Sequence, residues 1–415
     1  MREERKHIGF RVLLVGDTHP EMIAIAKILA RNKIDFRIVL PTYFTARESR
    51  FLSSVVIRGL GLNAWLRKRT LDTSIKSNSV IRKHAFLETC TWLFKRFGYH
   101  RMSWEFAMRY KNKLSNSLLR IIDSYRPHVL VSYDTIKVPR LEKIRHIVIC
   151  PMSHPIEVTK SLAEAKRLFP TWPEMDDEKP LGINETAKFA DRVIVLSRFA
   201  KNSYLSQGFE ESKLEVIHIG PINGNSQMSP PLETEKKILR ILFLGRMTRV
   251  KGVEALARLS NSLSPTKFQI ILVGQCPPNI SAYIRQISNC EVLTLVENPS
   301  PEVISEHFLN SDVFALPSFN EGFNISALEA MSYGLVPVLS KNAGVSEILE
   351  NTSLAQLVID PGSIDQLAQC FNYLSNLEQS DFNNLSNISF QLSKNFSFDK
   401  FAKDFLKVLN QELSR

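Results

Sequence analysis

The stretch that decides the fold is Ile238-Leu-Arg-Ile-Leu-Phe-Leu-Gly-Arg-Met-Thr-Arg-Val-Lys-Gly252. Its first seven residues form an almost continuous apolar run, which is typical of a strand buried on both faces of a parallel sheet. The run ends at Gly245, and a helical pattern begins near Gly252. A buried strand that leads through a short turn into a helix is the repeating unit of a doubly wound sheet. This stretch therefore predicts an α/β domain.

The same alternation of buried strands and helices continues on the C-terminal side. Four further strands are predicted at Phe268 to Val273, Glu291 to Val296, Val313 to Leu316 and Val336 to Leu339. Residues 237–395 are therefore expected to form one doubly wound domain. An amphipathic segment, Phe398 to Leu413, follows it, and we expect residues 396–415 to form a helix that packs back on the N-terminal half.

The N-terminal half repeats this pattern and ends in a turn-rich break. An apolar run at Arg11 to Val15 stops at Gly16 and precedes a helical pattern and a second strand, which together make a βαβ unit. Further strands are predicted at Val129 to Tyr133, His146 to Cys150 and Arg192 to Leu196. We expect a first Rossmann-like domain at residues 1–225 and a linker at 226–236. Two such domains facing a cleft would place the carboxyl ends of both sheets, where ligands bind, at that cleft.

Composition and charge narrow the classes of function. The five cysteines are scattered and have no CxxC spacing, so we expect a reducing cytoplasm and no structural zinc site. No run approaches the roughly 20 apolar residues of a membrane-spanning helix, so any membrane contact would be peripheral, at the inner face. Residues 1–150 hold 29 Lys and Arg against 12 Asp and Glu, whereas the rest of the chain has more acids than bases.

Between about residues 58 and 120, the N-terminal half combines many aromatic residues with many cations. The cations include the cluster Arg67, Lys68 and Arg69. This mixture suits an anionic membrane surface or an anionic acceptor. A solvated helix face over an aromatic core is the alternative. Nucleic acid is not an expected partner, because no RNA- or DNA-binding motif accompanies the charge.

The turn from Gly245 to Gly252 has the character of an anion-binding site. Backbone N–H groups and a helix start can meet an anion there, and Arg246 and Lys251 add two full positive charges suited to a diphosphate. The order of residues is not that of a P-loop, which needs Gly-Lys-Ser/Thr at the helix start. A plain strand-to-helix turn with two exposed cations is the alternative.

A second polar element follows the strand predicted at Val313 to Leu316. Glu321 lies in the loop, and Glu329 lies eight residues later, about two helical turns on, so both carboxylates can serve one ligand. Carboxylates accept hydrogen bonds from vicinal hydroxyls, as in a sugar or a ribose. The backbone N–H groups at the helix start can bind phosphate, and they belong to Gly322, Phe323, Asn324 and Ile325.

Together these two elements resemble the donor domain of the family-4 retaining glycosyltransferases of GT-B fold. The resemblance rests on Gly245-Arg246-x4-Lys251-Gly252, then Glu321-x7-Glu329, and then Gly344-x2-Glu347. It implies transfer from a nucleotide-diphosphate sugar with retention of configuration and without an essential metal or other cofactor. It further implies that Arg246 and Lys251 bind the diphosphate, Glu321 the transferred sugar and Glu329 the ribose.

The resemblance is weaker in the N-terminal half. A histidine after a late strand often lies near the reacting centre in this family, which makes His154 the candidate, although a structural turn residue is equally consistent. The usual glycine-rich loop is reduced to Gly16-Asp17-Thr-His19-Pro20, so Gly16 is the expected donor contact and Asp17 or His19 could face the acceptor. Asn324 stands where the family more often has glycine.

The sequence thus predicts a glycosyltransferase acting on a glycan or lipid-linked acceptor in cell-surface polysaccharide or glycoconjugate synthesis. The nucleotide is expected to be UDP or GDP. Two alternatives remain, namely a sugar-nucleotide epimerase and a non-catalytic binding subunit on a membrane surface.

Overall fold

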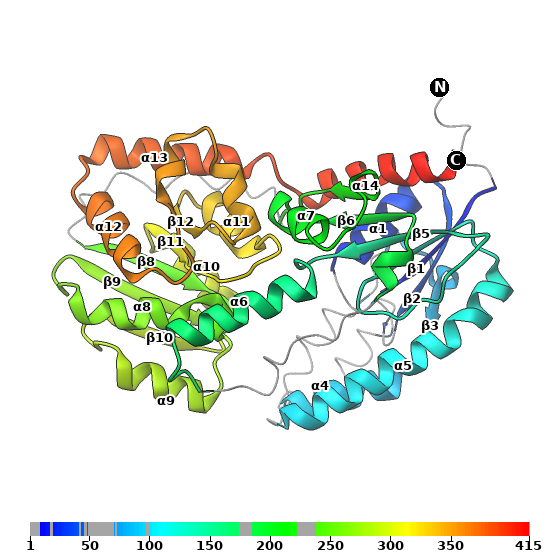
Figure 1. Ribbon diagram of the computed structural model, residues 1–415, viewed down its shortest axis with the longest axis horizontal. Coiled ribbons are helices and arrows are strands. Elements are labelled where there is room, and N and C mark those ends of the chain that lie inside the picture. Colours follow the sequence, from blue (N-terminus) through cyan, green and yellow to red (C-terminus); the bar gives the residue numbers. More distant parts are fainter. Residues whose placement is uncertain are drawn as a thin grey trace.

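A computed structural model describes residues 9–16, 20–40, 43, 44, 48, 70, 73–96, 99–173, 185–221 and 238–414. The predicted α/β class is confirmed, because the chain forms two parallel sheets, each flanked by helices, that lie side by side (Figure 1). The predicted linker at 226–236, Asp17, His19 and the Arg67 to Arg69 cluster lie outside the described residues. Within the described ranges, no helix is both long and apolar enough to cross a membrane.

The first sheet has seven parallel strands in the order β3-β2-β1-β4-β5-β6-β7. They are β1 (Arg11–Val15), β2 (Asp35–Leu40), β3 (Val80–Arg82), β4 (Val129–Tyr133), β5 (Arg145–Cys150), β6 (Arg192–Val195) and β7 (Leu214–Val216). The central strands are buried on both faces, which explains their continuous apolar sequence. The chain changes direction across the sheet between β1 and β4, and such a switch point is where open sheets bind ligands.

The helices of the first domain cover both faces of this sheet. Within the described residues they are α1 (Pro20–Arg31), α4 (Ala85–Arg96), α5 (His100–Tyr125) and α7 (Arg198–Leu205), with short 3-10 helices η1 (Ser77–Ser79), η3 (Glu185–Phe189) and η4 (Glu211–Lys213). The long helix α5 buries Leu114, Leu118 and Ile122 against strand residues such as Leu13 and Leu130. This i, i+4, i+8 spacing places the three side chains on one helical face.

The second sheet has six parallel strands in the order β10-β9-β8-β11-β12-β13. They are β8 (Leu239–Leu244), β9 (Phe268–Gly274), β10 (Leu293–Glu297), β11 (Val313–Leu316), β12 (Val336–Ser340) and β13 (Val358–Ile359). The strand predicted from the opening stretch is thus β8. Its neighbours are β9 and β11, so the switch point of this sheet lies between β8 and β11.

Six helices and four 3-10 helices surround the second sheet. The helices are α8 (Val253–Leu259), α9 (Pro278–Ile287), α10 (Pro301–Leu309), α11 (Ile325–Ser332), α12 (Ile364–Ser375) and α13 (Gln379–Ser393). The 3-10 helices are η5 (Arg249–Lys251), η6 (Ser260–Ser262), η7 (Gly344–Leu349) and η8 (Ser353–Leu357). This count refers to residues 238–414.

Two helices join the domains. Helix α6 (Pro155–Leu168) runs from the first domain to η5 of the second (Figure 1), where Arg249 donates to the carbonyl oxygen of Trp172 at 2.6 Å. The last helix, α14 (Phe398–Leu413), lies against α1. There Arg192 forms a buried ion pair with Glu412 at 2.8 Å. The two domains are therefore in contact through α6, and α14 places the end of the chain on the first domain.

Candidate functional site

The two predicted polar elements meet at the switch point of the second sheet. Gly245 and Arg246 directly follow β8, and the loop that begins at Pro317 follows β11. The N–H of Phe319 donates to the carbonyl oxygen of Val250 at 2.7 Å, which ties that loop to the turn. Gly252 has φ 71°, and a Cβ there would overlap the carbonyl oxygen of Pro317. Only glycine fits this left-handed, closely packed position.

The turn and the loop also share an ion pair. Lys251 pairs with the carboxylate of Glu321, and both side chains are largely buried. Burial and the neighbouring positive charge of Arg246 lower the pKa of Lys251 to about 8. Contact with the Glu321 carboxylate acts in the opposite direction and favours the charged amine. The result is a cluster of two cations and one anion at the carboxyl edge of β8 and β11.

Backbone hydrogen bonds hold the Glu321 loop in place. The N–H of Glu321 donates to Asn342, and its carbonyl oxygen accepts from Gly344 at 2.9 Å. The carbonyl oxygen of Phe323 accepts from Val345 at 3.0 Å. Residues 342–345, after β12, therefore act as a template that fixes the conformation of the loop.

The start of α11 carries unsatisfied backbone donors. Asn324 has φ 92°, which explains why glycine also suits this position, and its side chain caps α11 by accepting from the N–H of Ala327 at 2.8 Å. Among the residues that the structure describes, the N–H groups of Gly322, Phe323, Asn324 and Ile325 have no acceptor. Such donors at a helix start attract an anion.

Glu329 lies in the second turn of α11. It is half-buried, and burial raises the pKa of its carboxyl group. Within the described ranges, its side chain has no hydrogen-bond or ion-pair partner. A partly desolvated carboxylate without a partner is a strong acceptor for hydroxyl groups.

The first domain touches this site directly. A Cβ on Gly322 would overlap the carbonyl oxygen of Pro151, so the two backbones are in close contact. The Ser197 hydroxyl donates to the carbonyl oxygen of Gly322 at 2.6 Å, and the Ser153 hydroxyl donates to Asn320 at 2.8 Å. The carboxyl edges of the two sheets therefore face one another across the Glu321 loop.

His154 has structural contacts in this arrangement. It is the N-cap of α6, where its Nδ1 accepts from the N–H of Ile156 at 3.3 Å. Its ring makes edge contacts with Tyr204 and Phe209, and burial lowers its pKa, which keeps the ring neutral at pH 7. The role near the reacting centre stays a prediction, whereas capping and packing are what the geometry shows.

The carboxyl edge of the first sheet has polar residues that were not predicted to belong to the site. The predicted donor contact Gly16 directly follows β1, and a Cβ there would lie 2.6 Å from Met22. At the end of the adjacent β4, the Tyr133 hydroxyl donates to Glu21 at 2.8 Å. The next residue is Asp134, whose pKa burial raises to about 6 although the charge of Lys111 acts in the opposite direction. For Asp134, the position directly after a predicted strand was a signal in the sequence, whereas the contact of Tyr133 with Glu21 depends on the fold.

Glu347 is a second residue whose role was missed. Its carboxylate accepts from the backbone N–H of Arg198 at 2.7 Å and contacts His218 Nε2 at 2.6 Å. The His218 ring also lies against Phe323 of the Glu321 loop. Glu347 thus links the two domains beside the site, and its place in the Gly344-x2-Glu347 motif was the only hint.

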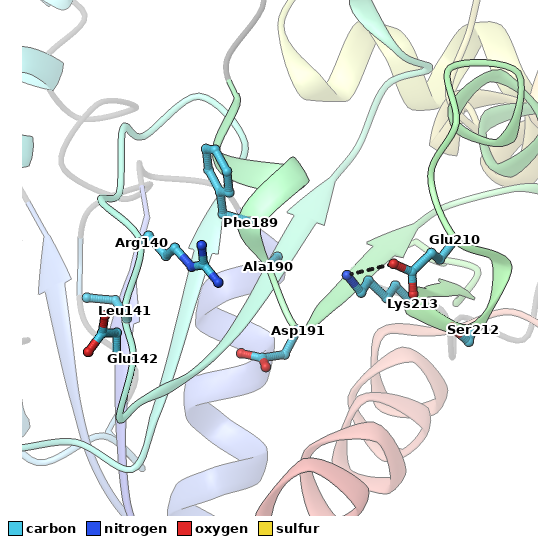
Figure 2. A pocket seen from close by; sticks show the side chains of 9 residues that line it. All are labelled: Arg140, Leu141, Glu142, Phe189, Ala190, Asp191, Glu210, Ser212 and Lys213. Carbon is cyan, nitrogen blue, oxygen red and sulfur yellow. Dashed lines mark ion pairs between the residues drawn. The ribbon is translucent and has the colours of Figure 1, made fainter.

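A separate hollow lies at the opposite edge of the first sheet. Its volume is about 680 Å³, and Figure 2 shows it at the amino ends of β6 and β7. Its lining consists of Arg140, Leu141, Glu142, Phe189, Ala190, Asp191, Glu210, Ser212 and Lys213. None of the predicted site residues belongs to that described lining. Among the described residues, no group of three or more His, Cys, Asp and Glu could hold a metal ion.

Known proteins are similar to this chain over part of its length. Residues 226–388 match the family described as Glycosyl transferases group 1. The N,N'-diacetylbacillosaminyl-diphospho-undecaprenol alpha-1,3-N-acetylgalactosaminyltransferase of Campylobacter jejuni is 29% identical over 175 residues, which cover 40% of this chain and 46% of that relative. The lipopolysaccharide 1,6-galactosyltransferase of Salmonella typhimurium is 25% identical over 212 residues, 49% of this chain and 57% of the relative. The chain spans about half the length of these curated relatives.

A solved structure is similar over nearly the whole chain. Anabaena HepE in complex with UDP and glucose has a TM-score of 0.59 and 13% identity, and the match covers 97% of this chain and 100% of that one. At this identity the similarity concerns the fold alone. Residues 226–388 are therefore similar to the glycosyl transferases group 1, and the two facing domains of the chain have a fold of the GT-B type.

Proposed function

We propose that this protein transfers a sugar from a nucleotide-diphosphate donor, bound by the second domain, to an acceptor bound by the first. The observation that carries the proposal is the cluster at the switch point of the second sheet. There, Arg246 and Lys251 supply positive charge beside the Glu321 carboxylate and the open N–H groups of α11. This is the chemistry that a diphosphate joined to a sugar requires.

The cations would act mainly on the leaving group. Negative charge builds on the diphosphate as the bond from the anomeric carbon to the phosphate oxygen breaks. Two cations and the helix-start N–H groups in a closed cleft stabilise that charge, and the loss of one such contact typically costs about 2.7–4 kcal/mol. Because these groups already neutralise the diphosphate, the proposed mechanism contains no metal-dependent step and needs no cofactor.

The two glutamates would hold the two ends of the donor. We assign Glu321, beside Lys251, to the hydroxyls of the transferred sugar, and Glu329 to the ribose. In a retaining transfer the acceptor oxygen bonds to the anomeric carbon on the face that the diphosphate leaves. The acceptor proton passes to the departing phosphate oxygen, so no second carboxylate is required as a base. Transfer by this route requires that the two domains close on each other. The contacts of Gly322 with Pro151 and Ser197 belong to such a closed arrangement.

The names of similar proteins guide the choice of substrates. The Campylobacter relative acts on an undecaprenol-diphosphate-linked sugar and the Salmonella relative on lipopolysaccharide, so we propose a glycan or lipid-linked glycan acceptor in cell-surface polysaccharide or glycoconjugate synthesis. The UDP in the HepE structure favours UDP over GDP as the first nucleotide to test. Five free thiols are consistent with the proposed cytoplasmic location.

Product analysis tests the proposal against its alternatives. The purified protein would be incubated with UDP- and GDP-sugars, with and without lipid-linked and free glycan acceptors, and all products identified by mass spectrometry and NMR. A new α- or β-linkage that matches the donor anomer supports a retaining transferase. An altered nucleotide sugar without an acceptor would instead indicate an epimerase, and no product at all would favour a binding subunit. Glu321→Gln provides the matched inactive control.

A further inference from the structure

The exposed apolar side chains of this protein are concentrated on one helical hairpin. Of twelve large apolar side chains that lie exposed in the described part of the chain, seven belong to α4, α5 and their connection. They are Phe86, Leu93, Tyr99, Met102, Trp104, Met108 and Leu119. Phe86 is 75% exposed and Trp104 55%, so the aromatic rings themselves meet solvent. Such a concentration on one surface marks an interaction site.

Helical geometry arranges part of this surface as a stripe. Trp104, Met108 and Leu119 recur at intervals of four and eleven residues, which places them on one flank of α5. The inner flank of α5 is already occupied by the sheet, through Leu114 and Leu118. Helix α4 adds Phe86 and Leu93, seven residues apart and therefore on one side of that helix. In Figure 1 the hairpin lies at the outer edge of the first domain.

A row of cations accompanies the apolar stripe. Arg109, Lys113 and Arg120 are exposed and recur on the outward side of α5. In the ranges that the structure describes, none of the three forms an ion pair with an acidic side chain. Residues 85–120 hold seven Lys and Arg against two Glu, so the hairpin carries a net charge of +5. The cations are therefore available to an external anion.

We propose that the outer face of the α4–α5 hairpin docks on an anionic lipid bilayer. A helix with apolar and aromatic side chains beside a row of cations binds in the plane of the headgroups, where Trp and Tyr favour the interface. A second copy of this chain fits less well, because two faces of +5 would repel each other. This inference concerns a surface distinct from the donor cluster and does not depend on the proposed function.

Vesicle flotation tests the docking surface with the full chain. Vesicles of phosphatidylcholine alone are compared with vesicles that contain phosphatidylglycerol, at low and at physiological salt. Each cation beside anionic lipid contributes about fivefold to binding, so the combined Arg109→Gln, Lys113→Gln and Arg120→Gln variant is expected to bind the anionic vesicles about 100-fold less tightly. The combined Trp104→Ser, Met108→Ser and Leu119→Ser variant should lose at least about tenfold.

Matched variants separate this surface from general effects. Lys267→Gln, Arg240→Gln and Lys403→Gln neutralise three exposed cations elsewhere, and Leu309→Ser with Tyr373→Ser removes exposed apolar groups from the second domain. Both controls should bind anionic vesicles as the unmodified protein does. Thermal melting and nucleotide titration of every variant show whether the fold and the donor site are retained.

Three results would overturn the proposal. The first is no binding of the unmodified protein to anionic vesicles, and the second is equal loss in the control and hairpin variants. The third is self-association without lipid that the hairpin variants abolish, since the surface would then be a contact between copies. If nucleotide binding fails while vesicle binding persists, the proposed function is wrong and the docking surface stands.

Discussion

The two halves of the molecule share one architecture but position their polar residues differently. Each has a parallel sheet with a switch point, between β1 and β4 in the first half and between β8 and β11 in the second. In the second half, two short turns carry the charges, and hydrogen bonds to neighbouring backbone fix these turns, as at Lys251 and Glu321. In the first half, the residues that meet the site, such as Pro151 and Ser197, do so through contacts with the other domain.

This difference shows where each kind of function is encoded. In the proposed function, donor binding depends on short motifs whose residues lie close together in the sequence. Contact between the two domains depends on residues more than a hundred positions apart, such as Ser197 and Gly322. Variants in the second half should therefore affect nucleotide binding, whereas variants at the contact between the halves should affect transfer with nucleotide binding retained.

The largest effect is expected for Lys251→Ala. Loss of one cation that stabilises the leaving diphosphate should lower the transfer rate by about 10²–10³-fold. The rate is measured under saturating donor and acceptor, with Lys267→Ala, an exposed lysine of the same domain, as the control. A rate within twofold of the unmodified protein in Lys251→Ala would remove this residue from the mechanism.

Gly322→Ala tests the contact between the halves. The added methyl group would overlap the carbonyl oxygen of Pro151, which prevents full closure of the domains. A misplacement of about 1 Å at the reacting centre should reduce kcat by between about tenfold and 100-fold. Nucleotide affinity, measured by calorimetry, should stay nearly constant. If both quantities fall together, the loop itself is damaged, and the separation between the two halves is lost.

The pH dependence of nucleotide binding should show the titration of Lys251. Because the pKa of this amine is about 8, the diphosphate loses a cationic partner above pH 8, and affinity should fall by up to about tenfold per pH unit. In Lys251→Arg the guanidinium stays charged, so this fall should disappear. A calorimetric series from pH 6.5 to about 9.5 makes the comparison.

Stability should change with pH in the opposite direction. The folded state binds fewer protons than the unfolded state between about pH 8 and the ordinary lysine value of 10.5, so the free energy of unfolding contributed by Lys251 rises across that window. Urea unfolding at several pH values measures this slope. Parallel pH dependence in unmodified and Lys251→Arg protein would show that another group titrates.

The smallest effect on the donor site is expected for His154→Ala. Loss of the cap of α6 and of the ring contacts with Tyr204 and Phe209 should lower the free energy of unfolding by about 2 kcal/mol. Nucleotide affinity should not change, because the ring packs within the first domain. The transfer rate of folded His154→Ala protein tests the predicted catalytic role. A loss of more than about 100-fold in that rate would support the role. His307→Ala serves as a histidine control.

Much of the fold could be predicted because short local patterns of apolar and polar residues determine its strands and turns. The apolar runs at β1, β8 and β11 are continuous because both faces of the sheets are covered, so strand type and position follow from the residues themselves. The turns after β8 and β11 could also be placed on one edge, since neighbouring parallel strands end together. Asn324 stands where the family more often has glycine. Its φ of 92° explains the preference for glycine at this position.

Other features could not be predicted, because tertiary contacts decide them. The capping role of His154, the link from Glu347 to His218 and the course of α6 toward Arg249 all depend on how the two domains meet. No pattern within either segment specifies these partners. The contact between Glu21 and Tyr133 could not be predicted for the same reason, since only the sheet brings the end of β4 next to α1.

The most direct test of the central claim is a calorimetric titration of the purified protein with UDP, GDP, ADP and CMP, repeated with Arg246→Ala and Glu329→Ala. The account predicts that one nucleoside diphosphate binds clearly better than CMP. Loss of a hydrogen bond to a charged group typically costs about 1.5–3 kcal/mol, so each variant should weaken that binding by at least about tenfold. Binding of no nucleotide, or equal binding in all three proteins, would contradict the assignment of the second domain as the donor site.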